Sequence, residues 1–174
     1  KNTYIDAATG AALPEYASLK FRPGSGNMSD FNVGSACSYP MMRVEEMYFI
    51  EAEAAAQQNP AQGVNLLNDF MSNYRDPQYK CTKSSKEDVV KEIVFQKRVE
   101  LWGEGQSFFD IKRLNLPVTR GYAGTLHHTI GRFNTTTRPA WMNFCIVRSE
   151  GNNNTALVGF ENPDPSDVYS SWAE

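Results

Sequence analysis

The central part of the chain, residues 41–114, has the pattern of several short helices divided by strong breakers, and this feature constrains the fold most. Helix-forming Ala, Glu, Leu and Met dominate there, and glycine is limited to apparent helix boundaries. The two flanks, residues 1–40 and 115–174, are rich in Gly, Ser, Asn, Thr and Pro, which favour turns and loops. We therefore predict a mainly α protein with a helical core, long irregular loops and little β structure.

The first two predicted helices form a hairpin. The sequence "QQNP" ends the first helix, at about residues 42–58, because the residue before a proline is pushed out of the α region. Pro60 suits the first turn of the second helix, which stops near "RDPQ". A link this short makes the helices antiparallel, and the pair fills about 34 residues, the length of a tetratricopeptide unit. Each helix has an apolar stripe at helical spacing: Met47, Ile50 and Ala54 on the first, and Val64, Leu67, Met71 and Tyr74 on the second.

The third and fourth predicted helices form a second, shorter pair of the same tetratricopeptide-like kind. Ser84 begins the third helix, and its hydroxyl forms a capping box with Glu87. Gly103 and Gly105 separate it from a fourth helix over residues 106–114. The third helix is apolar on most sides, which predicts that it is sandwiched between neighbours. One of its apolar faces is Val90, Ile93, Val94, Lys97 and Leu101, and the other is Phe95, Val99 and Trp102.

Two helical pairs are fewer than the three or so repeats that stacks of this kind need. We therefore expect further helices from a longer chain or a partner, or packing against the irregular flanks. The length of 174 residues and the apolar fraction of 41% suit a single domain over residues 1–174 with a core of its own.

Composition and motifs argue against several functions. The 17 basic residues are outnumbered by 20 acidic ones, the net charge is −3 and no basic stripe occurs, which argues against nucleic acid as a partner. No apolar run approaches the roughly 20 residues that cross a membrane. The chain has no P-loop, no Gly-x-Ser-x-Gly turn and no dinucleotide-binding glycine pattern. We therefore expect no cofactor.

No metal-binding spacing is found in the sequence either. His127 and His128 are adjacent, and consecutive side chains project in different directions, so they seldom bind one ion. Cys37, Cys81 and Cys145 are widely spaced and odd in number. At least one of them cannot join an internal disulfide, and free buried thiols are the favoured interpretation.

The stretch "VELWGEGQSFFDIKR" carries the carboxylates that first suggest catalysis. Glu100 and Glu104 are one helical turn apart, so their carboxylates are expected to share a helix face. Glycosidase carboxylates instead flank the sugar from two sides, about 5 to 9 Å apart. Nearby arginine and lysine side chains also favour the charged form of a carboxylate, which does not suit a general acid. We therefore expect structural ion pairing here and not catalysis.

Aromatic residues outside the predicted helices suggest sugar binding, because π-faces stack on the C–H groups of sugar rings beside Asn and Arg donors. For any single aromatic, core packing is the favoured role. The run "WMNFCIV" in the C-terminal flank could form a strand. The aromatics in question are Tyr4, Tyr16, Tyr39, Tyr122, Trp141, Tyr169 and Trp172.

Three helical stretches also share a charge pattern with a known family. In "YPMMRVEEMYFIEAEAAAQ", one helix carries Arg43, Glu46 and Glu53, and "GVNLLNDFMSNYRD" follows with Asn68 and Arg75. These stretches resemble the SusD/RagB family. The most specific stretch, "FQKRVELWGEGQSFFDIKR", is similar to its Glu-Arg-x-x-Glu-Leu-x-x-Glu-Gly-x-Arg-x-x-Asp-Leu-x-Arg signature. The matching positions are Arg98, Glu100, Leu101, Glu104, Gly105, Phe109, Asp110 and Arg113.

The resemblance runs from about residue 19 to residue 163. It departs at Gln96, where an acidic residue is common, and at Gln106, where Arg is usual. Further on, "FCIVRSEGNNN" resembles the family's "IP-x-x-E-x-x-x-N" segment with Val147 in place of the proline, and "ENPDP" is similar to its terminal "QNPGY". In the family this region would be the C-terminal third of the protein.

The resemblance implies a surface-exposed outer-membrane lipoprotein of Bacteroidetes that captures glycans and has no catalytic activity. Such a protein sits as a lid on a SusC-like TonB-dependent transporter. Its tetratricopeptide-like helices face the transporter, and irregular insertions carry the sugar site. The lipid anchor and most helical repeats would lie N-terminal to this chain, so its membrane attachment would depend on an anchor that it lacks.

We therefore expect glycan capture for import, with Tyr122 and Trp141 as candidate sugar-binding residues. The alternative is a tetratricopeptide-like protein–protein interaction or scaffold module. A glycosidase would require Glu100 and Glu104 to face an open cleft. Phe95, Trp102 and Phe109 are expected to fill the core. The residues expected to form a structural ion-pair network are Arg43, Glu46, Glu53, Arg98, Glu100, Glu104, Asp110 and Arg113.

Overall fold

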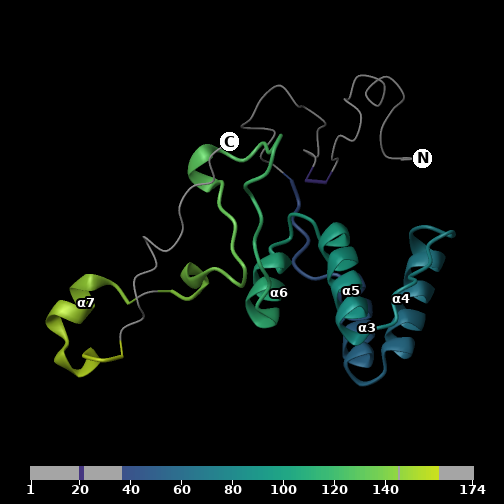
Figure 1. Ribbon diagram of the computed structural model, residues 1–174, viewed down its shortest axis with the longest axis horizontal. Helices are drawn as coiled ribbons and strands as arrows, with labels where there is room; N and C mark the ends of the chain where they lie inside the picture. Colours follow the sequence, from purple (N-terminus) through teal and green to yellow (C-terminus); the bar gives the residue numbers. More distant parts are fainter. Residues whose placement is uncertain (1–19, 22–36, 145, 161–174) are drawn as a thin grey trace. The chain divides into compact units, whose positions relative to one another are not determined.

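The structure is a computed structural model that describes residues 20–21, 37–144 and 146–160. The chain forms two compact units, Lys1–Arg43 and Val44–Glu174. In the described part of the first unit, the rings of residues 21 and 39, a Phe and a Tyr, lie 5.2 Å apart. The second unit contains the helices labelled in Figure 1.

Helices α3 (Val44–Gln58) and α4 (Pro60–Tyr74) form the predicted hairpin. Asn59 in the link is extended, and its side chain accepts a hydrogen bond from the Ala61 N–H at 3.1 Å. This bond caps the start of α4. Pro60 has no backbone N–H and therefore leaves no unpaired donor in the first turn. The link therefore ends one helix and begins the next within a single residue.

The α3–α4 contact depends on Gly63 in α4. A Cβ at that position would lie 2.5 Å from the Cβ of Ala56 and 2.9 Å from the backbone oxygen of Ala52. Side chains do not approach that closely in a packed interior, so glycine alone fits there. Elsewhere in the hairpin, the rings of Phe49 and Phe70 pack edge to face with centroids 5.0 Å apart.

Helix α5 (Lys86–Glu100) packs against α3 and, less extensively, against α4. Its start is capped by Ser85, whose hydroxyl accepts from the Asp88 N–H at 3.1 Å. The predicted capping box at Ser84 and Glu87 is therefore wrong by one residue. The buried core of the three helices consists of Phe49, Ala52, Ala56, Leu67, Phe70, Cys81, Val89, Val90, Ile93 and Val94.

Helix α6 (Gln106–Leu114) forms over the predicted residues. It lies between Gly105, with φ 82°, and Asn115, with φ 53°. Both values are in the left-handed region, where glycine is free of strain and asparagine is tolerated. α6 packs only marginally on α5, whose main partner is α3. The third and fourth helices therefore pack on each other less extensively than the first pair does.

The apolar stripe predicted on α3 is on the wrong face. Met47, Ile50 and Ala54 are exposed, and the packed face carries small residues and one ring. Small side chains let α3 approach α4 closely, so this face is buried although it is less apolar. The buried residues of α3 are Phe49, Ala52, Glu53 and Ala56.

On α5 only one of the two predicted apolar faces is buried. The face that runs from Val90 to Leu101 lies in the core, as expected. Phe95, Val99 and Trp102 are between 55% and 60% exposed, so within the described residues α5 is not sandwiched. The expectation that Phe95, Trp102 and Phe109 fill the core is wrong, because Phe109 is exposed as well.

After α6 the chain is largely irregular. It contains the short 3-10 turns η1 (Thr129–Gly131), η2 (Ala140–Met142) and η3 (Thr155–Leu157), and one short helix, α7 (Arg148–Asn153). The strand predicted over residues 141–147 is wrong, because η2 occupies its start and its described residues pair with no strand. A strand needs such a partner to be stable.

Three further features concern the part of the chain that the structure describes. None of its helices is both long and apolar enough to cross a membrane. Cys37 and Cys81 are free thiols, and Cys81 is buried. Cys145 lies outside the described residues.

Candidate functional site

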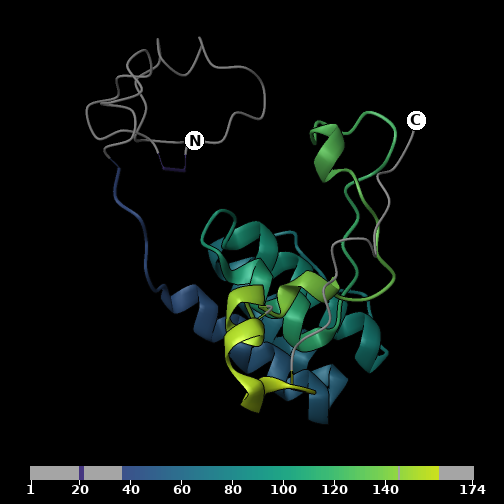
Figure 2. The same cartoon turned by 90° about the vertical axis from the view of Figure 1, so that its left-hand side faces the viewer.

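A loop hairpin that follows α6 forms the frame of the candidate site. Its two arms, residues 117–121 and 132–135, run side by side in Figures 1 and 2. An isolated antiparallel bridge joins Thr119 to Asn134, and backbone hydrogen bonds of 2.9 and 3.0 Å lie on either side of it. The hairpin is therefore held by hydrogen bonds and not by a buried apolar core.

The side chain of Asn134 fixes the first arm. Its oxygen accepts from the N–H groups of Arg120 at 3.1 Å and Gly121 at 2.9 Å, and its amide donates to the Gly121 carbonyl at 2.8 Å. The hydroxyl of Thr125 donates to the Arg120 carbonyl at 3.0 Å. Both backbone polar groups of Arg120 are thus bound, which sets the direction from which its side chain leaves the chain.

A cavity of about 470 Å³ lies between this hairpin and helices α5 and α6, and we call it the Trp141 pocket. Its volume is within the range of small-molecule sites. Aromatic residues, Ser and Thr, one His and two Arg are among the residues that line it. The lining residues are Arg98, Ser107, Phe108, Ile111, Pro117, Val118, Thr119, Arg120, His127, Trp141 and Met142.

Aromatic contacts hold two of these lining groups in place. Trp141 packs edge to face on Phe133, with ring centroids 6.0 Å apart. The guanidinium carbon of Arg120 lies 5.2 Å from the centroid of the same Phe133 ring, a cation–π contact. Phe133 therefore supports both the indole and the guanidinium, and Trp141 remains 39% exposed.

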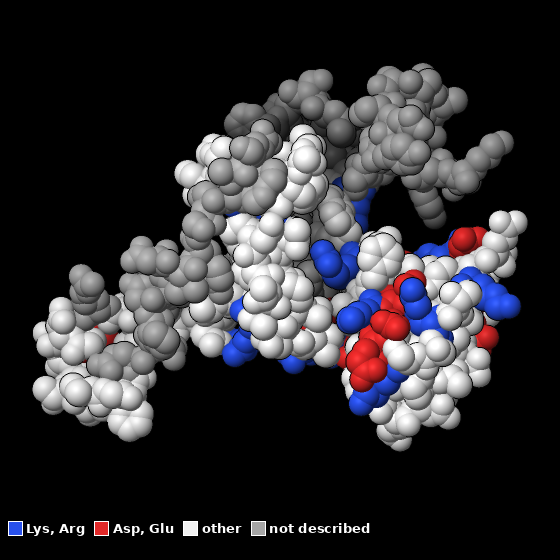
Figure 3. Space-filling model, in the orientation of Figure 1, with Lys and Arg blue, Asp and Glu red and all other residues white. Residues whose placement is uncertain are grey.

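The side chains that carry charge in the lining of the Trp141 pocket are all basic. Arg98 from α5 and Arg120 from the loop hairpin both contribute, and no Asp or Glu occurs among the lining residues. Neither arginine forms a salt bridge with a carboxylate of the described residues. Figure 3 shows a different arrangement over the helices at the right, where acidic and basic side chains are interspersed.

The two candidate sugar-binding residues lie in different surroundings. Trp141 lines the pocket. Tyr122 follows Gly121 at the tip of the first arm, where it is 51% exposed and does not line the pocket.

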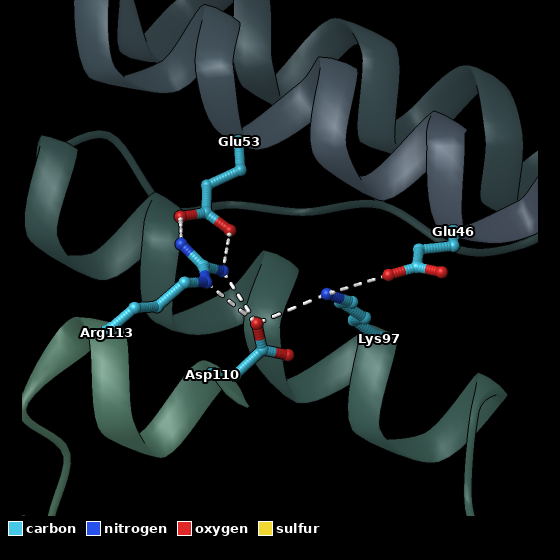
Figure 4. Close-up of polar contacts among 5 residues, drawn as sticks. All are labelled: Glu46, Glu53, Lys97, Asp110 and Arg113. Atoms are coloured by element: carbon cyan, nitrogen blue, oxygen red, sulfur yellow. Dashed lines mark hydrogen bonds and ion pairs between the residues drawn. The ribbon is translucent and has the colours of Figure 1, made fainter. Parts of the chain in front are cut away.

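Four of the predicted network residues meet in one ion-pair cluster between α3, α5 and α6, together with Lys97 (Figure 4). Arg113 binds both carboxylate oxygens of Glu53 at 2.6 Å. It also donates to Asp110 Oδ1 at 2.8 and 2.9 Å. Lys97 lies 3.2 Å from the same Asp110 oxygen and 3.8 Å from Glu46. The cluster therefore links the three helices by charge.

The cluster is a buried structural element. Glu53, Lys97 and Asp110 are 8%, 5% and 1% exposed, and buried charges are tolerated only when they are paired. The bidentate hydrogen bonds with Glu53 raise the pKa of Arg113 above its ordinary value. Asp110 Oδ2 has no hydrogen-bond partner among the described residues, so this carboxylate is held from one side.

Glu100 is held by Arg75, at the end of α4. Arg75 donates to both oxygens of Glu100, at 2.6 and 2.8 Å, and to Glu45 at 3.1 Å. Its guanidinium carbon also lies 5.2 Å from the centroid of the Phe70 ring. Hydrogen bonding with Glu100 raises the pKa of Arg75. This contact joins the end of α5 to the α3–α4 hairpin.

The remaining network residues are Glu104, Arg98 and Arg43. α5 ends at Glu100, so Glu104 lies in the turn before α6 and the expected shared helix face is wrong. Arg98 lines the Trp141 pocket and belongs to none of the ion pairs described above. Arg43 is the last residue of the first compact unit, Lys1–Arg43.

The ion-pair cluster and the Trp141 pocket differ in the groups that they present. The two cations of the cluster are paired with its three carboxylates, whereas no Asp or Glu lines the Trp141 pocket. No group of three His, Cys, Asp or Glu side chains in the described ranges is placed to hold a metal ion. What the pocket offers is a ring for stacking beside hydrogen-bond donors.

Several lining residues were not selected from the sequence. Phe108 and Ser107 lie in a stretch interpreted as structural, and Arg120 and His127 lie in a flank without periodicity. One sequence signal points to the loop hairpin in retrospect. Asn134 follows Phe133 in a Gly- and Thr-rich run, and asparagine side chains bind backbone groups in loops.

The fold and the pocket together define a class: a mainly helical protein in which a packed helical hairpin and a third helix carry a loop-built pocket. The chain belongs to the SusD family, whose sequence model matches residues 1–163.

Among solved structures, the chain is similar to a SusD-like carbohydrate binding protein from Bacteroides vulgatus. The two share 24% identity with a TM-score of 0.58, over 83% of this chain and 34% of that one. The chain therefore spans about a third of the length of that protein, and the likeness shows the fold. Comparison with curated protein sequences gave no significant match.

Proposed function

We propose that this protein is the glycan-binding component of a SusC/SusD-type uptake system and that it captures oligosaccharides without cleaving them. Its partner would be a SusC-like TonB-dependent transporter at the outer membrane. The full-length protein would be held at the cell surface by a lipid anchor. Membership of the SusD family supports this proposal.

The observation that carries the proposal is the Trp141 pocket. A sugar ring presents apolar C–H groups on its face and polar hydroxyls around its edge. A partly exposed indole next to arginine and hydroxyl side chains can meet both kinds of group. Its loop hairpin is fixed by hydrogen bonds before any ligand arrives. A preformed site loses little conformational entropy on binding.

The test is affinity electrophoresis of the whole chain against a panel of polysaccharides, followed by titration calorimetry. Loss of a tryptophan at the centre of a site costs about 2 kcal/mol, or roughly 30-fold in Kd. We therefore expect Trp141→Ala to bind about that much more weakly. Trp102→Ala is the matched control, since this exposed Trp does not line the pocket. If no polysaccharide retards the wild-type chain, the proposal fails.

A second candidate function, a protein–protein interaction module, is favoured by a separate observation. An apolar groove of about 440 Å³ runs along α5, lined among others by Val94, Phe95 and Leu116. Its occupant would be an amphipathic helix of a protein partner, which such grooves accept. If Phe95→Ser abolished co-purification of a SusC-like transporter while no glycan bound, this second function would replace the first.

A further inference from the structure

We propose that the Trp141 pocket selects an acidic sugar, one that carries a carboxylate or a sulfate ester. This inference rests on the proposed glycan binding and names the class of glycan. It assigns Arg98 and Arg120 to the anionic group and Trp141 to the face of the ring.

The first argument is the charge of the lining. The chain as a whole has a net charge of −3, but two arginines and no Asp or Glu line the pocket. Two guanidinium groups that share one small cavity repel each other unless an anion lies near both. A neutral sugar would leave this repulsion in place, whereas a carboxylate or sulfate would relieve it.

The second argument comes from the other arginines of the same fold. Arg75 binds Glu100 and Glu45, and Arg113 binds Glu53 and Asp110. Each of these guanidinium groups is therefore neutralised by two carboxylates. Arg98 and Arg120 form none of these ion pairs, and both line the Trp141 pocket.

The third argument is the way the two groups are presented. Arg120 lies over the Phe133 ring, with its backbone fixed by Asn134. Stacking uses the face of a guanidinium and leaves the N–H groups at its edge to donate. Arg98 comes from the last turn of α5 and lines the same cavity. The planar fork of each arginine matches the paired oxygens of a carboxylate or sulfate.

The experiment compares matched polysaccharides on the full chain by affinity electrophoresis and calorimetry. Polygalacturonate is set against its methyl ester, which has the same backbone without the charge. Chondroitin sulfate is set against unsulfated chondroitin to separate sulfate from carboxylate. We expect polygalacturonate to bind about tenfold or more tightly than its methyl ester, or chondroitin sulfate to bind about tenfold or more tightly than chondroitin, because a hydrogen bond to a charged group contributes about 1.5 to 3 kcal/mol. We also expect its affinity to fall at high salt.

Variants connect the preference to the two arginines. Arg98→Gln and Arg120→Gln should each remove most of the charged-over-neutral preference, and each should leave the melting temperature within a few degrees of wild type. Lys91→Gln is the matched control. It makes the same change of charge on α5, two turns before Arg98, and outside the Trp141 pocket.

The outcomes distinguish the two proposals. If neutral glycans bind and depend on Trp141 but not on the arginines, glycan binding stands and the acidic-sugar inference is overturned. If no glycan binds, both are overturned. If polyglutamate binds as tightly as the acidic polysaccharide, the pocket recognises anionic peptides and the inference is likewise overturned.

Discussion

The helical core and the loop hairpin are built by different forces. The core of α3, α4 and α5 buries apolar side chains around a close helix contact at Gly63. Buried ion pairs at the edge of this core add to its stability. The loop hairpin buries little and is held by side-chain and backbone hydrogen bonds, several from Asn134 alone. The helical core and the loop hairpin therefore depend on different residues.

This difference teaches how the fold can hold a site that varies. Burial and buried charge contribute several kcal/mol at single positions, so residues of the core tolerate few changes. Groups that line an exposed pocket contribute little to folding. A loop such as residues 117–142 can therefore change its lining without unfolding the helices beneath it.

The largest expected effect comes from the ion-pair cluster of the core. Asp110→Asn removes the nearer of two carboxylates from Lys97, which is 5% exposed, and leaves Glu46 at 3.8 Å. Breaking a buried pair costs about 3 to 5 kcal/mol. We expect the free energy of unfolding to fall by about 3 kcal/mol, measured by urea denaturation followed by circular dichroism.

The control for this change is Asp69→Asn, the same substitution at an exposed position of α4. It should change stability by no more than about 0.5 kcal/mol. If both variants unfold at the wild-type urea concentration, the cluster does not stabilise the core and the contrast with the loop hairpin is lost.

The next effect concerns the α3–α4 contact. Gly63→Ala adds a Cβ that would lie 2.5 Å from the Cβ of Ala56, so the helices must separate. Overpacking costs about 1 to 3 kcal/mol, against which alanine recovers up to about 1 kcal/mol of helix propensity. We expect a net loss of about 1 to 2 kcal/mol in the unfolding transition. Gly151→Ala, in open space on α7, should be neutral or slightly stabilising. An equal effect at both glycines would contradict the close packing.

A change in the loop hairpin should lower stability little and weaken glycan binding strongly. Asn134→Ala removes three hydrogen bonds from an exposed loop, which lowers stability by only about 1 kcal/mol. It should nevertheless weaken glycan binding at least about tenfold, because Arg120 loses its fixed backbone. Affinity electrophoresis and thermal melting of the same sample separate the two effects. Full binding by this variant would show that the hairpin does not position the site.

The same division decides what the sequence could predict. The α3–α4 hairpin and α6 were predictable because Pro60, Asn59 and the glycines around α6 act locally, through the backbone conformations that they allow. The family pattern also pointed to the charges at Glu53, Asp110 and Arg113. Such signals lie within one helix or at its ends and do not depend on distant parts of the chain.

Packing faces and the pocket were not predictable in this way. The buried face of α3 was missed because Ala52 and Ala56 are less apolar than Met47 and Ile50, and the deciding factor is the close approach of Gly63. The pocket brings α5 and α6 together with a loop that has no periodicity. Of the residues that line the pocket, only Trp141 was selected beforehand for binding, because its aromatic ring suggested sugar.

The smallest expected effect tests a hydrogen bond that ties the segment after α4 to α5. Tyr79 donates from its hydroxyl to Glu92 Oε1 at 2.8 Å. Burial is the main cause that raises the pKa of Tyr79 above its ordinary value of 10.0, and this hydrogen bond is the second cause. At neutral pH, Tyr79→Phe should lower the free energy of unfolding by about 0.5 to 1 kcal/mol, because the bond is partly open to solvent.

The pH dependence of this variant has a definite sign. A raised pKa means that the folded chain holds the Tyr79 proton more tightly than the unfolded chain does. Its contribution is therefore fully present below pH 10.0 and is lost as the pH rises toward the folded-state pKa. Urea denaturation from about pH 8 to about pH 11 should show the gap between wild type and Tyr79→Phe closing in the alkaline range. Ionisation of the other tyrosines and lysines affects both proteins alike and cancels in the difference. A gap that stayed constant through that range would mean that the hydroxyl is solvated in the folded protein, and the segment after α4 would then resemble the loop hairpin more than the core.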